Sequence, residues 1–344
     1  MKGLYLAISL TTRCNLSCFY CKPTGESISE QTGDLSFDDF QRIVHSAYLQ
    51  GINKFRLTGG ECSLVPYFED AVHFIMELGS DVRINICSNG FLLPKFFELF
   101  KEYKDRINVR ISVDSLQKEL NGVTFPKYLS HQIESIVQPL LKIGIKTRFN
   151  IVVTSYNFCE LEKLIKRSLS IGVDIKLLDL YIQDVYLGES RSSMINNPKK
   201  FWQTTYVSLT QIKPFLEKIC DTYIDNFDED SAFGIPMRAY KYKNQAIILK
   251  DSSKGAHFSK ICKKGCKKYL ECQEGIYVPF VSVGGVLHIN GCRNEKLRWN
   301  LSNMTNEAMQ AAFREVLALF DDLEVCYDSS ISFCKHLSNV ENKV

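Results

Sequence analysis

Residues 11–23 read TTRCNLSCFYCKP and place three thiols on one short segment. Cys14, Cys18 and Cys21 are spaced C-x3-C-x2-C, directly after the short apolar run YLAISL. An apolar run that gives way to polar residues predicts a buried strand that leads into a loop. We therefore expect the three thiols to lie together just beyond the end of the first strand.

This spacing is suited to a metal centre. Thiolates are soft ligands that favour zinc or iron–sulfur clusters. A structural zinc site needs a fourth Cys or His, and the first histidine of the chain is the distant His45. Three thiolates can instead hold three irons of a [4Fe–4S] cluster, which usually has four protein ligands. The loop therefore favours a catalytic iron–sulfur cluster on Cys14, Cys18 and Cys21, with one iron open to a substrate.

The composition excludes several classes of protein. Hydrophobic residues make up 45% and charged residues 24% of the 344 residues, as in ordinary soluble globular proteins. A formal charge of +3 does not indicate a nucleic-acid partner. No apolar run reaches the roughly 18 residues of a membrane span, and the N-terminus lacks a signal-peptide cleavage site. We expect a cytoplasmic protein whose thirteen cysteines bind metal and do not form disulfides.

The first half of the chain alternates apolar strands with amphipathic helices. This alternation predicts parallel strands joined by right-handed crossovers. Six such units predict an α/β fold, a partial (β/α)6 TIM-like barrel with its active face at the carboxyl ends of the strands. The candidate strands are Tyr5–Leu10, Lys54–Thr58, Arg83–Ser88, Asn108–Ser112, Thr147–Thr154 and Ile175–Asp179.

The alternation stops near Val185, which predicts three parts. Residues 1–185 are the expected barrel. Residues 186–255 are expected to form a connector with a helix near Leu209–Tyr223. Residues 256–344 carry six of the cysteines and a helical pattern over Asn306–Phe320, and they are expected to form a small C-terminal domain.

Further motifs lie at or near the ends of the predicted strands: RLTGGE (56–61), SNG (88–90), ISVDS (111–115) and RFNIVV (148–153). With the cysteine loop in register, the chain resembles the radical S-adenosylmethionine (SAM) superfamily. The resemblance implies that the GGE segment binds the methionine amino group, and glycines there permit close backbone approach. The SAM-binding residues that the resemblance implies are Tyr20, Gly59, Gly60, Glu61, Ser88, Asn89, Ser112, Arg148 and Asn150.

The resemblance also implies a radical reaction. One electron, from a donor such as flavodoxin or ferredoxin, would split SAM into methionine and a 5′-deoxyadenosyl radical that takes a hydrogen atom from the substrate. Cys62 and Asp114 are weak candidates for a catalytic role because both lie beside these motifs. A buried cysteine is more often a packing residue.

A second group of cysteines flanks a predicted hairpin with a Gly-Gly turn. It comprises Cys262, Cys266, Cys272 and Cys292. The arrangement resembles the auxiliary-cluster extension of the molybdenum-cofactor GTP cyclase family and of SPASM/twitch enzymes. The resemblance implies a second [4Fe–4S] cluster, with zinc on the same thiolates as the alternative. Cys326 and Cys334 are alternative ligands for this auxiliary cluster.

The likeness to the GTP cyclase family does not extend to the substrate residues. Ala7 and the apolar stretch YVPFV (277–281) stand where that family has arginines, so we do not expect GTP as the substrate. The leading hypothesis is an enzyme that cyclises, oxidises or rearranges a specialised metabolite, with the auxiliary cluster binding substrate or transferring electrons.

Two alternatives remain open. One is a maturase that introduces a thioether, a carbon–carbon cross-link or an epimer into a ribosomally made peptide. Relatives of that kind often carry a leader-binding domain, whereas this sequence starts at the barrel, which slightly favours a small molecule. The other is a non-catalytic iron–sulfur redox sensor, which would have no need of the GGE segment.

Overall fold

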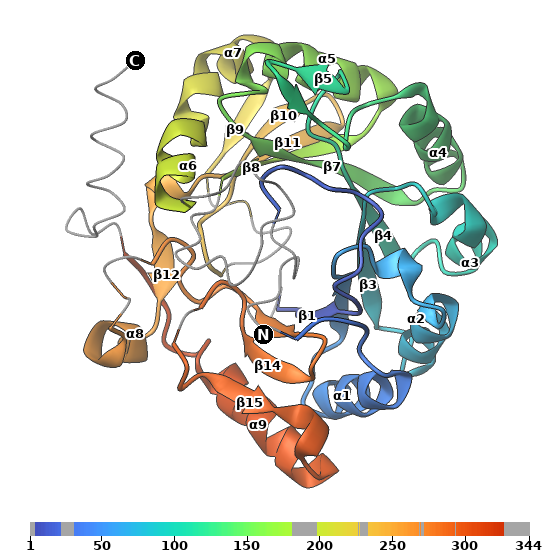
Figure 1. Cartoon of the computed structure of the whole chain (residues 1–344), viewed down its shortest axis with the longest axis vertical. Coiled ribbons are helices and arrows are strands. Elements are labelled where there is room, and N and C mark those ends of the chain that lie inside the picture. Colours follow the sequence, from blue (N-terminus) through green and yellow to red (C-terminus); the bar gives the residue numbers. More distant parts are fainter. Residues whose placement is uncertain are drawn as a thin grey trace.

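The computed structural model describes residues 4–21, 31–180, 198–225, 227, 233–267, 269, 272–292 and 294–326. Its centre is one large curved sheet with helices on the outer side (Figure 1). The described strands of this sheet lie in the order β15-β14-β13-β1-β2-β3-β4-β7-β8-β11-β10-β9. The two ends of this order, β15 and β9, are not paired with each other, so the barrel is open.

Six neighbouring strands form the parallel core that the sequence predicts. Each adjacent pair among them is parallel. Within the described residues the core is therefore the expected partial barrel, in a mixed α/β fold. The six strands are β1 (Leu6–Ser9), β2 (Lys54–Thr58), β3 (Arg83–Ser88), β4 (Ile107–Ser112), β7 (Lys146–Val153) and β8 (Asp174–Asp179).

Helices between these strands cover the outer face of the sheet (Figure 1). Ser36 caps the first of them by accepting a hydrogen bond from the Asp39 amide, which satisfies a donor that the helix leaves unpaired. Gly172 ends the last one in the left-handed conformation with a φ of 98°. The helices are α1 (Phe37–Leu49), α2 (Phe68–Glu77), α3 (Phe97–Glu102), α4 (His131–Lys142) and α5 (Leu161–Ile171).

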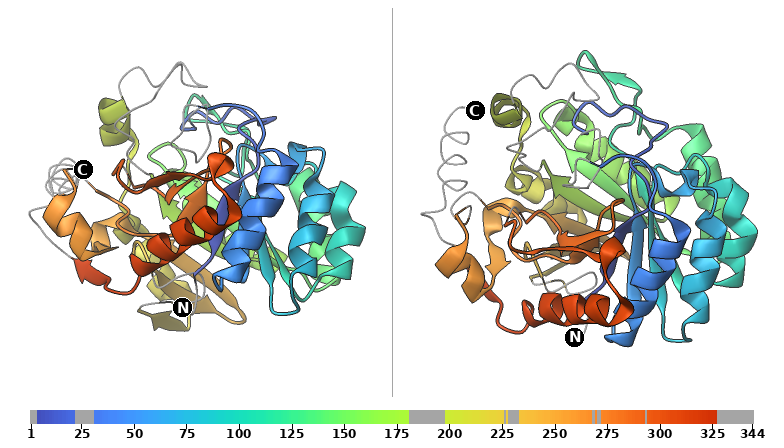
Figure 2. Two further views of the ribbon diagram at one scale, coloured as in Figure 1. Left: turned by 90° about the horizontal axis from the view of Figure 1, so that it is seen from below. Right: turned by 60° about the horizontal axis from the view of Figure 1, so that its bottom comes forward.

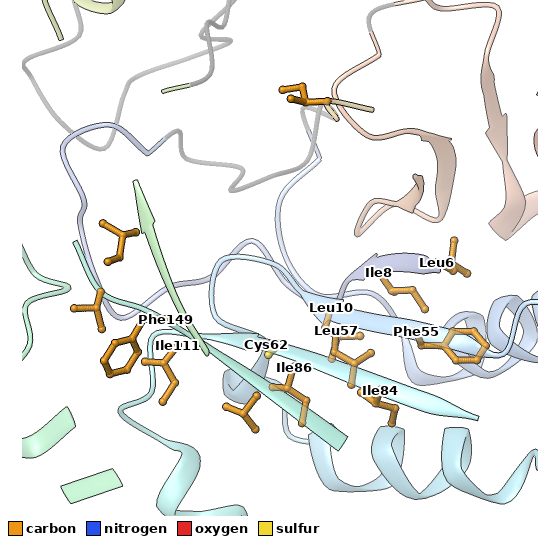
Figure 3. Close-up of a cluster of buried hydrophobic side chains, with 14 of the residues drawn as sticks. Leu6, Ile8, Leu10, Phe55, Leu57, Cys62, Ile84, Ile86, Ile111 and Phe149 are labelled. Atoms are coloured by element: carbon orange, nitrogen blue, oxygen red, sulfur yellow. The ribbon is translucent and has the colours of Figure 1, made fainter. Parts of the chain in front are cut away.

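Alternate strand residues point toward these helices and form the main core. Leu6, Ile8, Phe55 and Leu57 are fully buried there (Figure 3). Their neighbours point to the inside of the barrel, where Ala7 packs in a separate cluster. Because side chains alternate across a strand, even and odd positions serve different purposes, and the inward positions are the ones available for a site.

The sheet continues beyond the point at which the alternation stops in the sequence. The strand β11 (Gln245–Lys250) pairs parallel to β8, and β13 (Pro279–Val281) pairs parallel to β1. The predicted hairpin is β13 with β14 (Val286–Ile289), whose turn includes Gly285 at a φ of 68°. The segment expected as a connector therefore contributes strands to the same sheet as the barrel.

The predicted helix over Leu209–Tyr223 is wrong at its C-terminal end. It is the short helices η4 (Leu209–Ile212) and α7 (Lys213–Ile219), after which the chain turns extended and forms β9 (Thr222–Ile224). β9 pairs antiparallel with β10 (Arg238–Tyr242). Pairing with a partner distant in the sequence has overridden the local helical pattern.

The C-terminal helix α9 (Asn306–Ala318) packs beside α1 and extends the outer layer (Figure 2). The Arg42 guanidinium donates a 2.5 Å hydrogen bond to the carbonyl oxygen of Met304, just before this helix. No described helix is long and apolar enough to cross a membrane. The remaining described elements are η1 (Cys62–Leu64), η2 (Leu93–Phe96), β5 (Glu119–Leu120), β6 (Val123–Thr124), η3 (Phe158–Glu160), α6 (Pro198–Thr205), η5 (Ser252–Lys254), β12 (Ala256–Phe258), α8 (Lys260–Gly265), β15 (Arg298–Asn300), η7 (Leu301–Asn303) and β16 (Glu324–Cys326).

Candidate active site

The cysteine loop is held at its start by the GGE segment at the end of β2. The Gly60 amide donates a 2.7 Å hydrogen bond to the Thr11 carbonyl, and the Glu61 amide donates a 2.9 Å bond to the Arg13 carbonyl. A Cβ atom on Gly60 would lie 2.3 Å from the Arg13 carbonyl oxygen, and one on Gly59 would lie 2.4 Å from that of Thr11. The two glycines are therefore required by close packing against the loop.

The Glu61 carboxylate connects the ends of β2 and β3. It is buried and accepts hydrogen bonds from the Ser63 hydroxyl at 2.6 Å, the Ser88 hydroxyl at 2.8 Å and the Asn89 amide at 2.7 Å. The Asn89 side chain in turn donates a 2.7 Å bond to the side-chain oxygen of Asn15, in the cysteine loop. Glu61, Ser88 and Asn89 thus form one polar framework under the loop.

The three loop thiols lie above this framework. Cys18 is buried, whereas Cys14 and Cys21 are half-buried, and none of the described cysteines forms a disulfide. The Cys21 amide bonds to the Cys18 carbonyl at 3.0 Å, which curls the loop. Burial raises the pKa of Cys18 to about 12. Thiols bind iron as thiolates, so loading the loop with metal must release protons.

The far end of the loop is anchored on the opposite side of the barrel, next to β4 and β7. In Figure 1 the loop, in dark blue, crosses from β1 toward that side. Phe19 is buried and makes edge-on ring contacts with Phe125 at 5.4 Å and Tyr156 at 5.5 Å between centroids. The Tyr20 hydroxyl donates a 2.5 Å hydrogen bond to the Asp114 carboxylate. The aromatic pair between the second and third cysteines therefore fixes the loop over the barrel.

The inward positions of β4 and β7 carry three of the predicted SAM-binding residues. Ser112 and Asn150 lie opposite each other in register, at the same level of the barrel. The Asn150 side-chain oxygen is buried and has no hydrogen-bond partner within the described residues, which suits a ligand hydroxyl or amine. Arg148 is opposite Arg110, two residues and roughly 7 Å deeper in the barrel.

These residues coincide with a known family pattern. The model of the Radical SAM superfamily matches residues 8–167, which run from β1 into α5 and include the loop, the GGE segment and β7. Residues 8–167 are therefore identified as a radical SAM domain. This match implies SAM and one [4Fe–4S] cluster as cofactors, and the three thiols on one loop are a fitting donor set for that cluster.

The sequence relatives include two enzymes named GTP 3′,8-cyclase. That of Nautilia profundicola is 28% identical over 177 residues, which are 51% of this chain and 55% of the relative. That of Clostridium acetobutylicum is 31% identical over 183 residues, which are 51% of this chain and 56% of the relative. The chain therefore spans about half the length of the curated relatives it matches.

Solved structures extend the likeness over most of the fold. Streptococcus suis SuiB bound to S-adenosylmethionine matches with a TM-score of 0.57 and 14% identity, over 89% of this chain and 65% of SuiB. Native anSMEcpe with bound AdoMet matches with a TM-score of 0.53 and 14% identity, over 98% and 99% of the two chains. At such identities the likeness is one of fold alone.

Cys62, a weak catalytic candidate, packs in the core of the radical SAM domain. Figure 3 shows its sulfur among Leu57 and Ile86. The side chain is fully buried, its thiol donates a 3.3 Å hydrogen bond to the Cys87 carbonyl, and burial raises its pKa well above the ordinary value. A neutral, bonded thiol of this kind is a packing residue.

The second cysteine group is brought together in space. Cys262, Cys266, Cys272 and Cys292 line one pocket, together with Phe258, Tyr269, Gly275 and Ile276. Burial raises the pKa of Cys272 to about 12 and that of Cys292 to about 11.

The alternative ligands are less informative. The backbone of Cys326 lies in β16, opposite Ala256 of β12, and Cys334 lies outside the described residues. No three His, Cys, Asp or Glu side chains within the described ranges form a site for a single metal ion.

Sequence reasoning missed Lys127. Its Nζ lies 3.3 Å from the Tyr20 hydroxyl and 5.5 Å from the centre of that ring. It also missed Asn157, whose side chain donates a 2.6 Å bond to the Asp114 carbonyl oxygen. Neither residue belongs to a motif, and only the path of the loop between β4 and α4 brings Lys127 to the cysteines.

Proposed function

We propose that this chain reductively cleaves SAM and uses the resulting radical to modify a small-molecule specialised metabolite by cyclisation, oxidation or rearrangement. The observation that supports this is the direct hydrogen bonding of the cysteine loop to the GGE segment at the end of β2. A cluster on the loop would then lie over the strand ends, where the active face of such a barrel is found.

The described residues have separate tasks in this reaction. When bound, the [4Fe–4S] cluster supplies the electron that splits SAM and so starts the hydrogen abstraction. Cys14, Cys18 and Cys21 would hold three of its irons. The main chain of the GGE segment would take the methionine end of SAM, while the Ser112 hydroxyl and the open oxygen of Asn150 would take its polar groups. Arg148 is a candidate for the SAM carboxylate or ribose.

We further propose that the second cysteine group holds an auxiliary [4Fe–4S] cluster in a C-terminal domain over residues 256–344. Four thiols on one pocket satisfy the ligand number of such a cluster, and its apolar walls would shield it from water. Zinc on the same thiolates is the competing assignment, although no three of the described Cys side chains are arranged as a single-ion site. Whether the second group holds a cluster or zinc, a donor such as flavodoxin or ferredoxin would supply the electrons that reduce the loop cluster.

The proposal of a small-molecule substrate follows the sequence relatives, which are named for an activity on GTP. The fold relative SuiB has also been solved bound to the precursor peptide SuiA, which favours peptide maturation as the second candidate. A direct comparison separates them. SAM turnover should be stimulated by the ultrafiltered small molecules of a source-cell extract, and stimulation by its peptide fraction alone would favour the maturase.

SAM cleavage itself tests the central proposal. After anaerobic reconstitution with iron and sulfide, dithionite should produce 5′-deoxyadenosine, measured by chromatography and mass spectrometry. Cys18→Ala should abolish this product, whereas Cys159→Ala, which changes an exposed cysteine, should retain it. Equal cleavage by Cys18→Ala would show that the loop is not the catalytic centre.

A further inference from the structure

Tyr20, Asp114 and Lys127 form a compact network directly beside the loop cysteines. The Tyr20 hydroxyl bridges the other two, with 2.5 Å to the Asp114 carboxylate and 3.3 Å to the Lys127 ammonium. The second carboxylate oxygen accepts a 3.0 Å bond from the Val152 amide. The Asp114 amide also donates a 2.6 Å bond to the Lys127 carbonyl, so the two residues are locked together through the main chain.

The network places a cation in a region that would hold thiolates. Tyr20 lies between Cys18 and Cys21 in the loop, and the Lys127 ammonium on its hydroxyl interacts electrostatically with both of these cysteines. The 3.3 Å contact with the Tyr20 hydroxyl and the main-chain bond between Asp114 and Lys127 hold the ammonium in this half-buried position.

The local charges do not cancel once a cluster is bound. Asp114 and Lys127 neutralise each other as a pair, which would suffice for an empty loop. Three thiolates bring additional negative charge, and each electron added to the cluster brings more. In a region of low dielectric constant, a nearby cation stabilises the more negative state.

We propose that Lys127 is a positioning residue for the loop cluster, whose ammonium, held by Tyr20 and Asp114, compensates thiolate charge and makes the cluster easier to reduce. This inference rests on the proposed cluster. It adds a residue outside every motif of the chain to the group that controls electron entry.

The test is the midpoint potential of the loop cluster in the full reconstituted chain, from an EPR-monitored titration. The loop signal is the one that Cys18→Ala removes. Lys127→Met keeps the length of the side chain and removes its charge. We expect its midpoint to fall by about 59 mV, which is a tenfold shift in a one-electron equilibrium. Lys127→Arg should stay near the wild-type value.

Lys118→Met is the matched control. Lys118 is exposed on the same connection between β4 and α4, so its loss removes the same charge at a distance from the loop. Its midpoint should be unchanged. Tyr20→Phe keeps the ring and removes the bridging hydroxyl, and we expect a smaller fall than for Lys127→Met because the ammonium is then less well held.

Each outcome bears on the inference. An unchanged midpoint in Lys127→Met with full iron content would overturn it. If Lys127→Met fails to load iron, retention of iron by Lys127→Arg would support a role for charge, whereas equal loss in both variants would show a role in packing alone. Absence of any Cys18-dependent signal from the wild-type chain would instead overturn the proposed function.

Discussion

The amide nitrogen of Gly60 donates a 2.7 Å hydrogen bond to the carbonyl oxygen of Thr11, so the GGE segment and the cysteine loop share a backbone contact. This contact resembles a short stretch of strand pairing that continues β1 and β2 past their ends. It leaves no room for a side chain on Gly60. The site that would bind SAM and the site that would bind iron are therefore mechanically one unit.

A methyl group at Gly60 should displace the loop. Its Cβ would lie 2.3 Å from the Arg13 carbonyl oxygen, a backbone atom. We expect Gly60→Ala to lose most of the roughly four irons of the loop cluster and SAM cleavage with them. Gly144→Ala is the control for backbone strain alone, because its φ of 89° disfavours alanine while no atom lies within 4 Å of the new Cβ. Similar iron loss in both would point to general destabilisation.

The iron content should divide between two cysteine groups. We expect about eight irons per reconstituted chain and about four after Cys14, Cys18 and Cys21 are all changed to Ala. Cys272→Ala should reduce only the iron of the auxiliary cluster and leave that of the loop cluster, because Cys272 lines the separate pocket. Metal analysis by mass spectrometry checks both values. About four irons with bound zinc in the wild-type chain would exclude two clusters.

Stability should fall as the pH rises through the range in which Asp179 titrates. Burial, with repulsion from Asp251, raises the pKa of Asp179 from 3.8 to about 7. Between pH 4 and pH 7 the folded chain keeps a proton that the unfolded chain has lost, which corresponds to roughly 4 kcal/mol at most. Asp179→Asn should therefore be more stable than wild type at pH 8 and nearly equal at pH 4. Denaturant titrations at both pH values measure the difference, and equal stability at pH 8 would contradict it.

The Lys250–Glu274 ion pair should stabilise the loop that carries Cys272. Its Nζ–Oε1 distance is 2.7 Å, and the two side chains are only 12% and 11% exposed. Glu274→Gln leaves a buried ammonium, which typically costs about 3–5 kcal/mol. We expect a lower melting temperature and weaker iron retention by the second cysteine group. Adding Lys250→Met should recover part of the stability, and equal loss in single and double variants would show that the charge is not the cause.

Much of the site could be predicted from short segments. The spacing of Cys14, Cys18 and Cys21, and the position of the GGE segment after β2, depend only on neighbours in the chain. The six parallel strands could be predicted in the same way, because the burial of every second residue is a pattern contained within each strand. For this reason the bounds of β2 and β3 agree with prediction, whereas the helix expected to reach Tyr223 does not.

The sequence by itself determined the order of the parallel core, the cysteine loop and the superfamily, because each is encoded by residues close together in the chain. Only the tertiary structure decided which distant residues meet. Tyr20 reaches Asp114 across 94 residues and Lys127 across 107. β13, which follows β1 by about 270 residues in the sequence, pairs directly with it in the sheet. Such contacts depend on strand register and loop path, which arise from packing the whole chain and leave no periodic signal in any one segment.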